Sequence, residues 1–144
     1  MKTKPYQLDT PTAVIGELAK RLQAQYGDDV LLIFSDVLKE YGRQGGMRLR
    51  KKTADLAFPE RVTVWLEPFL RSGKAEVVKS EGDRVTIKGF DCPLNLEATN
   101  QALCTALMRI DEGLVSALAE KDITLKIEKS LACEDSFCLV TFSR

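Results

Sequence analysis

The sequence predicts an α+β protein in which helices cover an antiparallel sheet of four strands. Three observations support this class. Apolar residues recur at helical spacing through the first half of the 144 residues, and from Gly73 onward the spacing changes to the alternation typical of strands. The strand patterns form two pairs, and one long helical pattern separates the pairs. Helices and hairpins segregated in this way favour an antiparallel sheet over a doubly wound parallel sheet.

The first predicted helix begins at the N-cap Thr12 and ends near Gly27. Its apolar stripe recurs every four residues, at Val14, Leu18 and Leu22. The second helix opens at Asp28, and we expect it to stop at Gly42, because glycine most easily adopts the left-handed conformation of a helix C-cap. The stripe of this second helix is Val30, Phe34, Val37, Leu38 and Tyr41.

A third helix is predicted after Gly45 and Gly46, with Met47, Leu49, Ala54 and Leu56 as its apolar residues. Around it lies a basic run of Arg43, Arg48, Arg50, Lys51 and Lys52. The run lacks the aromatic residues on which single-stranded nucleic acid stacks, so we interpret it as a solvated helix face. The fourth helix begins at Phe58, and Pro68 predicts its kink or end. Its apolar face is Val62, Trp65, Leu66 and Phe69.

Two β-hairpins and one long helix follow. Residues 74–80 and 84–90 flank a turn at Gly82 and form the first hairpin. The long helix is expected at about 97–120, with a buried stripe of Leu103, Leu107, Ile110, Leu114 and Leu118. Residues 123–128 and 137–143 form the second hairpin. We therefore expect one domain, 1–144, with a helical part at about 11–72 and the sheet with its long helix at about 73–144.

The composition excludes several classes of function. Lys and Arg number 21, as do Asp and Glu, so neither nucleic acid nor an anionic membrane surface is an expected partner. The absence of histidine excludes an imidazole base and also haem or zinc held by histidine. No glycine-rich nucleotide-binding motif is present. No apolar run reaches the roughly 18 residues of a membrane span, and no export signal is evident, so we expect a soluble, cytoplasmic protein.

The cysteines are the most informative residues. Cys92 precedes a proline where a strand ends, Cys104 lies on the long helix, and Cys138 falls in the last strand. Three elements can therefore bring these thiols together against the sheet. Three interpretations stay open: buried apolar side chains, a thiol-lined site for a small ligand or for a metal such as zinc, and a catalytic cysteine. The spacings match no common zinc motif.

Two further sets of residues are candidates for a site. Asp111 lies two turns after Cys104 on the same helix face, which makes Cys104 and Asp111 the candidate catalytic pair. Such spacing is common by chance, and a solvated helix surface is the favoured interpretation of Asp111. Trp65 and Leu107 are either core residues or part of the wall of an apolar pocket.

Several short motifs occur in an order that resembles a known family. They are a Tyr-Gly-Arg-x-x-Gly segment at 41–46, Asp-Cys-Pro at 91–93, Cys104 nine residues before Gly113, and Glu-Asp-x-x-Cys at 134–138. Over about residues 28–144 this order resembles the 4-vinyl reductase domain, also called the hydrocarbon-binding domain, of the superfamily that includes Golgi-transport and NO-signalling ligand-binding domains. The resemblance implies a homodimeric α+β domain that encloses an apolar small molecule, with Cys92, Cys104 and Cys138 as ligand or metal contacts.

The sequence departs from that family at two positions. Ser130 stands where many members have a cysteine, and Glu134 stands where glycine is usual, which puts a zinc site of the family's kind in doubt. A neighbouring resemblance is to L-2-amino-thiazoline-4-carboxylic acid hydrolase, which implies a thiol- or metal-dependent hydrolase that uses Cys104, Asp111 and Cys138. A third hypothesis is a dimeric interaction module. The leading hypothesis is an apolar pocket edged by sulfur, with Trp65 and Leu107 near its wall.

Overall fold

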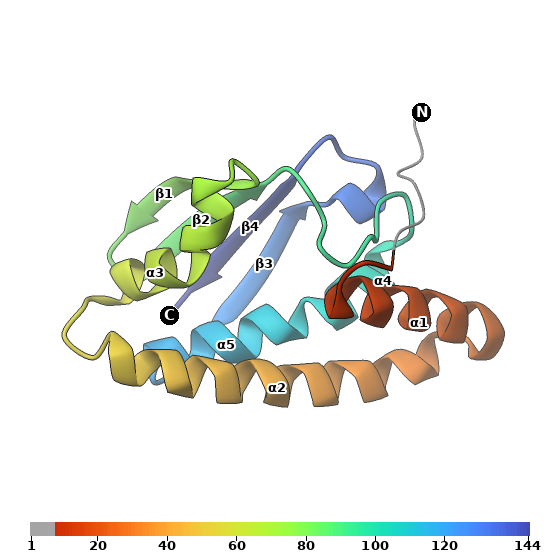
Figure 1. Ribbon diagram of the computed structural model, residues 1–144, viewed down its shortest axis with the longest axis horizontal. Coiled ribbons are helices and arrows are strands. Elements are labelled where there is room, and N and C mark those ends of the chain that lie inside the picture. The colour runs from red at the N-terminus through yellow and green to blue at the C-terminus, as the bar shows by residue number, and fades with distance from the viewer. Residues whose placement is uncertain (1–7) are drawn as a thin grey trace.

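A computed structural model describes residues 8–144 and confirms the α+β class (Figure 1). The helices are α1 (Pro11–Tyr26), α2 (Leu31–Lys52), α3 (Phe58–Arg71), α4 (Gln101–Leu107) and α5 (Arg109–Ala119). The strands are β1 (Ala75–Glu81), β2 (Arg84–Gly89), β3 (Thr124–Lys129) and β4 (Cys138–Ser143), and the short 3-10 turns are η1 (Asp28–Val30) and η2 (Leu131–Cys133). Among the described residues, no helix is long and apolar enough to cross a membrane. The segment in which an export signal was sought, 1–7, lies outside the described residues.

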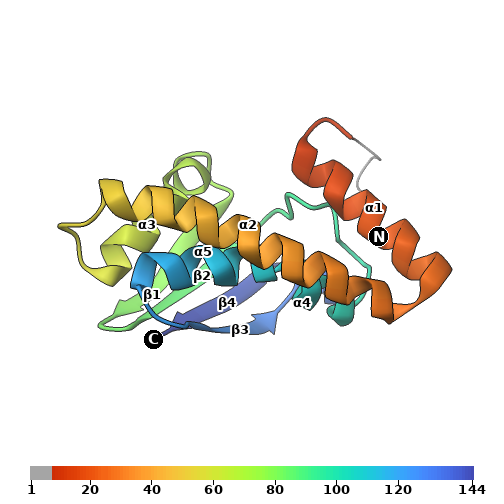
Figure 2. The ribbon, with the colours of Figure 1, turned by 90° about the horizontal axis from the view of Figure 1, so that it is seen from below.

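The four strands form one antiparallel sheet in the order β1-β2-β4-β3. Both predicted hairpins are therefore confirmed, and they meet where β2 pairs with β4. The helices all lie on one side of this sheet, as the view from below shows (Figure 2). We call the helix-covered side of the sheet its inner face. The arrangement is layered, because α5 packs on the inner face and α2 packs on the far side of α5.

Helix α2 corrects the predicted break at Gly42 and Gly46. The second and third predicted helices are one continuous helix, so within residues 8–144 three α-helices precede the sheet instead of four. Both glycines are buried where α2 crosses α5, and an added Cβ would lie 1.9 Å from the Ile110 carbonyl oxygen at Gly42 and 2.3 Å from that of Leu114 at Gly46. The two glycines therefore allow α2 and α5 to pack closely against each other, and neither of them is a helix C-cap.

The long helix also differs from its prediction. It starts later, at the N-cap Asn100, whose side chain accepts a hydrogen bond from the Leu103 amide at 2.9 Å. It is divided at Met108, whose carbonyl oxygen accepts from the amides of both Asp111 and Glu112. In α1 the N-cap is Thr10, not Thr12. In α3 the helix continues past Pro68 to Arg71 without ending there.

The core consists of two clusters. One lies between α3, α5 and the inner face of the sheet, with Phe58, Val62, Leu66, Val85, Ile87, Val115, Ala119, Ile123, Val140 and Phe142. The other lies around α4, between α1, α2 and η2, with Ala19, Leu31, Leu38, Leu96, Leu103, Cys104, Ala106, Leu107 and Ala132. Two half-buried side chains, Met108 and Ile127, contact both clusters.

Candidate functional site

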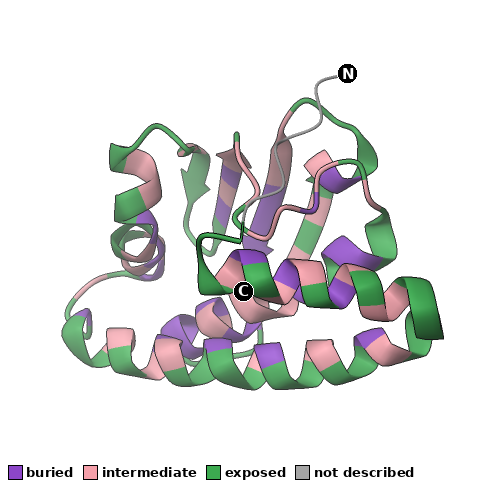
Figure 3. Ribbon diagram, turned by 45° about the vertical axis from the view of Figure 1, so that its right-hand side comes forward, coloured by how far each residue is buried: buried purple, intermediate pink, exposed green. Residues whose placement is uncertain are grey.

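The inner face of the sheet carries large side chains at one end and small ones at the other. In the register of β1, β2 and β4, Val85 is paired with Phe142, and two residues along, Ile87 is paired with Val140. At the far end Gly89 is paired with Ala75 on one side and with Cys138 on the other. We call Ala75, Gly89 and Cys138 the small-residue row. The central strands are buried toward α5 and only half-buried toward this row, as Figure 3 shows.

A pocket of about 300 Å³ opens beside the small-residue row. Its lining comes from the first turn of α1, from Phe69 of α3, from Lys74 next to the row, and from Asp91, Pro93 and Asn95 after β2. We call it the α1–α3 pocket. The wall on the α1 side is fixed in place, because the Lys20 ammonium donates to the Asn95 carbonyl oxygen at 3.0 Å. The volume lies at the lower end of the range of small-molecule sites, about 300–1,000 Å³.

The structure gathers the three predicted cysteines from three elements. Cys138 lies in the small-residue row, Cys92 follows β2 next to the lining residues Asp91 and Pro93, and Cys104 is buried on α4. Cys138 lies near enough to raise the pKa of both other thiols electrostatically. The three thiols thus lie in one region of the molecule, and none of them lines the α1–α3 pocket.

Burial disfavours the thiolate form of all three thiols. Burial raises the pKa of Cys92 to about 11 and also raises the pKa values of Cys104 and Cys138. The sulfur atoms of Cys92 and Cys138 each accept a backbone amide at 3.4 Å, from Leu96 and Leu131 respectively. Within residues 8–144, no group of three or more His, Cys, Asp or Glu side chains could hold a metal ion. The arrangement therefore offers neutral, polarisable contacts.

Ser130 and Glu134, the two residues that differ from the pattern described above, both have defined surroundings in the structure. The Ser130 hydroxyl donates to the Cys104 sulfur at 3.2 Å, so serine lies against the thiol where the family carries another cysteine. Glu134 adopts a left-handed conformation with φ of 66° at the end of η2. That conformation is easiest for glycine.

Asp111 is unlike every other acidic residue of the described chain in one respect: burial raises the pKa of its carboxyl to about 7. The carboxyl makes no hydrogen bond or ion pair with residues 8–144. In that part of the chain every fully buried side-chain oxygen and nitrogen has a partner, so the Asp111 oxygens must border water-accessible space. Asp111 also acts electrostatically on Cys104, which places the predicted pair in one neighbourhood.

Trp65 and Leu107 occupy different positions relative to this region. Leu107 is fully buried in the α4 cluster. Trp65 is half-buried one turn before Phe69 of the α1–α3 pocket, and its ring meets Phe142 edge-on with centroids 6.0 Å apart. Of the two, Trp65 is nearer to an accessible surface.

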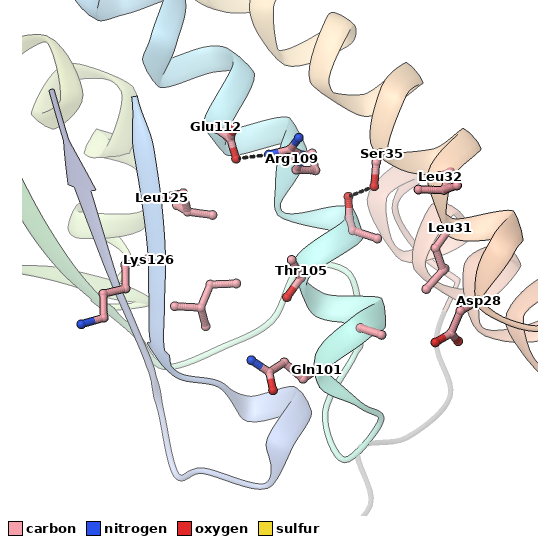
Figure 4. Close-up of a pocket in the computed structure, with 13 residues that line it drawn as sticks. Asp28, Leu31, Leu32, Ser35, Gln101, Thr105, Arg109, Glu112, Leu125 and Lys126 are labelled. Carbon is pink, nitrogen blue, oxygen red and sulfur yellow. Dashed lines mark hydrogen bonds and ion pairs between the residues drawn. The ribbon is translucent and has the colours of Figure 1, made fainter. Parts of the chain in front are cut away.

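A second pocket, of about 780 Å³, lies between α2, α4 and β3 (Figure 4). Leu31, Ala106 and Ile127 contribute apolar surface, and the ion pair of Arg109 with Glu112 lies at its edge. None of the six residues predicted as site residues lines either this pocket or the α1–α3 pocket, but Cys92 is the sequence neighbour of two residues that line the α1–α3 pocket. The second pocket is an open groove along an edge strand, and we place the candidate site at the α1–α3 pocket instead.

Sequence reasoning missed the small-residue row. Glycine and alanine in a strand carry no chemical signature, and only the pairing of β1, β2 and β4 aligns Ala75, Gly89 and Cys138. The signal present in the sequence was a Gly at the end of a strand with a cysteine three residues later. A strand glycine often marks a place where something approaches the sheet closely.

Comparison with known proteins identifies the fold. No family model matches the sequence, and no curated protein matches it significantly. Among solved structures, the chain is similar to the phenol-responsive sensory domain of the transcription activator PoxR, solved with phenol, with a TM-score of 0.70 and 12% identity over 95% of this chain and 76% of that one. It is also similar to trafficking protein particle complex subunit 3 from Naegleria fowleri, covalently bound to palmitic acid, with a TM-score of 0.56 and 15% identity over 92% and 93% of the chains. At these identities the likeness establishes that this chain has the fold of those two proteins, and it establishes no sequence family.

Proposed function

We propose that this protein is a small-molecule-binding domain that holds an apolar ligand in the α1–α3 pocket, over the small-residue row. The observation that carries the proposal is the row itself. Ala75, Gly89 and Cys138 leave the inner face without large side chains where a pocket opens, although the same strands carry Phe142 and Val85 at their other end. Ala13, Phe69 and Pro93 supply the apolar part of the lining, and its other residues are polar.

The two solved structures support this proposal by what they hold. Phenol and palmitic acid are both predominantly apolar small molecules, and both occupy proteins of this fold. The thiol-dependent hydrolase is less well supported. Burial raises the pKa of Cys104, so little thiolate is present at neutral pH, and the thiolate is the nucleophilic form.

The test of the proposal uses Trp65, the single tryptophan of the chain. Titration with N-phenyl-1-naphthylamine, an uncharged apolar fluorophore, is expected to give saturable energy transfer from Trp65. Gly89→Val is expected to weaken this binding about tenfold or more, because two methyl groups then stand in the pocket. The fold should accept the valine, since an added Cβ meets only the Cys138 Cβ, at 3.6 Å.

The matched control is Ser143→Val, which adds apolar bulk to the outer face of the same sheet. This control should bind the fluorophore like the wild type. Thermal unfolding of both variants, followed by circular dichroism, checks that they are folded. Absence of saturable binding to the wild type, or equal affinity in folded Gly89→Val, would contradict the proposal.

A specific observation favours a second candidate function, association of two copies through α2. Ile33, Val37 and Tyr41 project from the side of α2 opposite Gly42 and Gly46, and they are 65%, 63% and 64% exposed. Along the exposed side of α2, acidic residues lie toward the start of the helix and basic residues toward its end. Acidic Asp36 and Glu40 lie in the first half of α2 with Lys39 between them, and basic Arg43, Arg48, Lys51 and Lys52 follow; Glu40 is paired with Arg43 at 2.6 Å. An antiparallel pair of α2 helices across a two-fold axis sets each acidic half against a basic half.

Sedimentation velocity at increasing concentration tests this association. Wild-type protein is expected to sediment as a dimer, and Val37→Glu is expected to shift it to monomer by burying a carboxylate in the interface. Val64→Glu makes the same change at a 39%-exposed position of α3 and should leave the dimer intact. A wild-type monomer at all concentrations, or a Val37→Glu dimer as stable as the wild type, would overturn this candidate.

A further inference from the structure

We infer that the outer face of the sheet is a docking surface for an acidic segment of a partner protein, and that Lys88 and Lys129 together bind a carboxylate of that segment. The outer face is the side of the sheet that faces away from the helices, and within residues 8–144 no helix covers it (Figure 2). The inference is independent of the proposed function, because the α1–α3 pocket opens beside the inner face.

The strand register places the two lysines on one row of the outer face. Lys88 of β2 is paired with Leu139 of β4, and Lys129 of β3 is paired with the same leucine from the other side. Side chains alternate along a strand, and Val140, the next residue of β4, belongs to the inner core, so this row points outward. Phe137 lies two residues before Leu139 and shares its face. The row therefore brings two positive charges to one aromatic ring.

Both ammonium groups converge on the Phe137 ring. The Lys88 Nζ lies 4.2 Å from the centroid of this ring, and the Lys129 Nζ lies 4.9 Å from the same centroid. Lys88 also lies over Phe90, at 5.3 Å from its centroid, and Phe90 is 45% exposed. The negative face of an aromatic ring attracts a cation. Two long, flexible side chains are therefore held with their charges close together, and we call Lys88, Lys129 and Phe137 the two-lysine cluster.

The two-lysine cluster has no counter-charge of its own. Lys126, on the same face, is paired with Glu128 at 3.7 Å. Within residues 8–144, neither Lys88 nor Lys129 makes an ion pair or donates a side-chain hydrogen bond. Glu76 is opposite Lys88 in the register of β1 and β2, yet the two side chains form no ion pair. An anion from another molecule can therefore pair with both lysines without displacing an existing partner.

The chemistry of the cluster and its surroundings identifies the occupant. A carboxylate has two oxygens, and each can accept a charge-assisted hydrogen bond from a different lysine. An exposed ion pair contributes little by itself, so a stable complex also needs apolar contact. Phe90 and the half-buried Leu139 offer that contact beside the lysines. An acidic protein segment that carries an apolar residue next to its carboxylates supplies both.

Single-stranded nucleic acid is the alternative occupant of a sheet face that carries aromatic rings and cations. The contacts of this face disfavour it. Two ammonium groups already lie over the Phe137 ring, so a base would compete with them for the face on which it stacks. Glu76 and Glu128 also lie on this side of the sheet, where they would repel phosphates. A nucleic-acid site further needs a longer track of cations than two lysines.

The experiment measures the binding of fluorescein-labelled peptides by fluorescence anisotropy. The probe is Glu-Glu-Phe-Glu-Glu, and it is compared with Gln-Gln-Phe-Gln-Gln and with Glu-Glu-Gly-Glu-Glu. We expect saturable binding of the probe, and affinities about tenfold lower for the glutamine peptide and about threefold lower for the glycine peptide. Lys88→Gln and Lys129→Gln should each weaken binding of the probe about threefold, and the double variant should weaken it about tenfold.

Lys126→Gln is the matched control, since it removes one positive charge from the same face at a lysine that already has a partner. This control should change the affinity less than about twofold. Thermal unfolding followed by circular dichroism checks that each variant is folded. If Lys126→Gln weakens binding as much as Lys88→Gln does, the attraction belongs to the whole face and the inference is wrong. It is equally wrong if the probe does not bind, or if fluorescein-labelled oligothymidylate binds more tightly than the probe.

Discussion

Replacing Gly42 or Gly113 with alanine is expected to destabilise the protein strongly, by roughly 3 kcal/mol for each substitution. These glycines lie on facing sides of α2 and α5. A Cβ at Gly42 would lie 1.9 Å from the Ile110 carbonyl oxygen, and a Cβ at Gly113 would lie 2.1 Å from that of Lys39. Backbone cannot turn aside as a side chain can, so the two helices must separate. Urea denaturation measures the loss of unfolding free energy.

Gly45→Ala is the matched control on the same helix. Its Cβ would meet only the end of the Arg48 side chain, at 3.7 Å. Alanine is the better helix former by about 1 kcal/mol, so this variant should be more stable than the wild type. A loss of unfolding free energy in Gly42→Ala together with a gain in Gly45→Ala would confirm that close helix packing is the cause. Similar small effects at all three positions would refute it.

Asp111→Asn is expected to stabilise the protein at pH 8, on the order of 2–4 kcal/mol, and to have little effect near pH 4. The folded-state pKa of Asp111 is about 7, whereas an exposed carboxyl has a value near 3.8. Between those values the folded state binds more protons than the unfolded state, so wild-type stability falls as pH rises. Asparagine does not titrate and removes that loss.

Chemical denaturation of wild type and Asp111→Asn across pH 4–8 tests this expectation. The difference between their unfolding free energies should grow with pH through this window and level off above about pH 7. Asp122→Asn, at an exposed position, should run parallel to the wild type. A constant difference between Asp111→Asn and wild type would show that the Asp111 carboxyl titrates normally.

The sheet could be predicted from the sequence more accurately than the helices. Val85 and Ile87 alternate with polar residues around Gly82, and this local pattern fixes the first hairpin without help from the rest of the chain. The break expected at Gly42 failed because glycine has two uses that look identical in a sequence. It can end a helix, or it can let another backbone approach, and only the position of α5 decides between them.

The candidate site was predicted in part. The sequence predicts that three separate elements bring Cys92, Cys104 and Cys138 together, and in the fold these thiols lie near enough to act on one another electrostatically. The space beside them was not predictable, because it results from what Gly89 and Ala75 lack, and from strand pairing between residues far apart in the chain. The burial of Asp111 was likewise hidden, since a charged residue on a helix is usually exposed.

The glycine contacts between α2 and α5 also determine how the molecule responds to force. With backbone touching backbone at Gly42, Gly46 and Gly113, no side chain stands between the two helices to absorb a displacement by changing rotamer. We therefore expect a displacement of α5 to be passed on to α2, whose exposed side carries Val37.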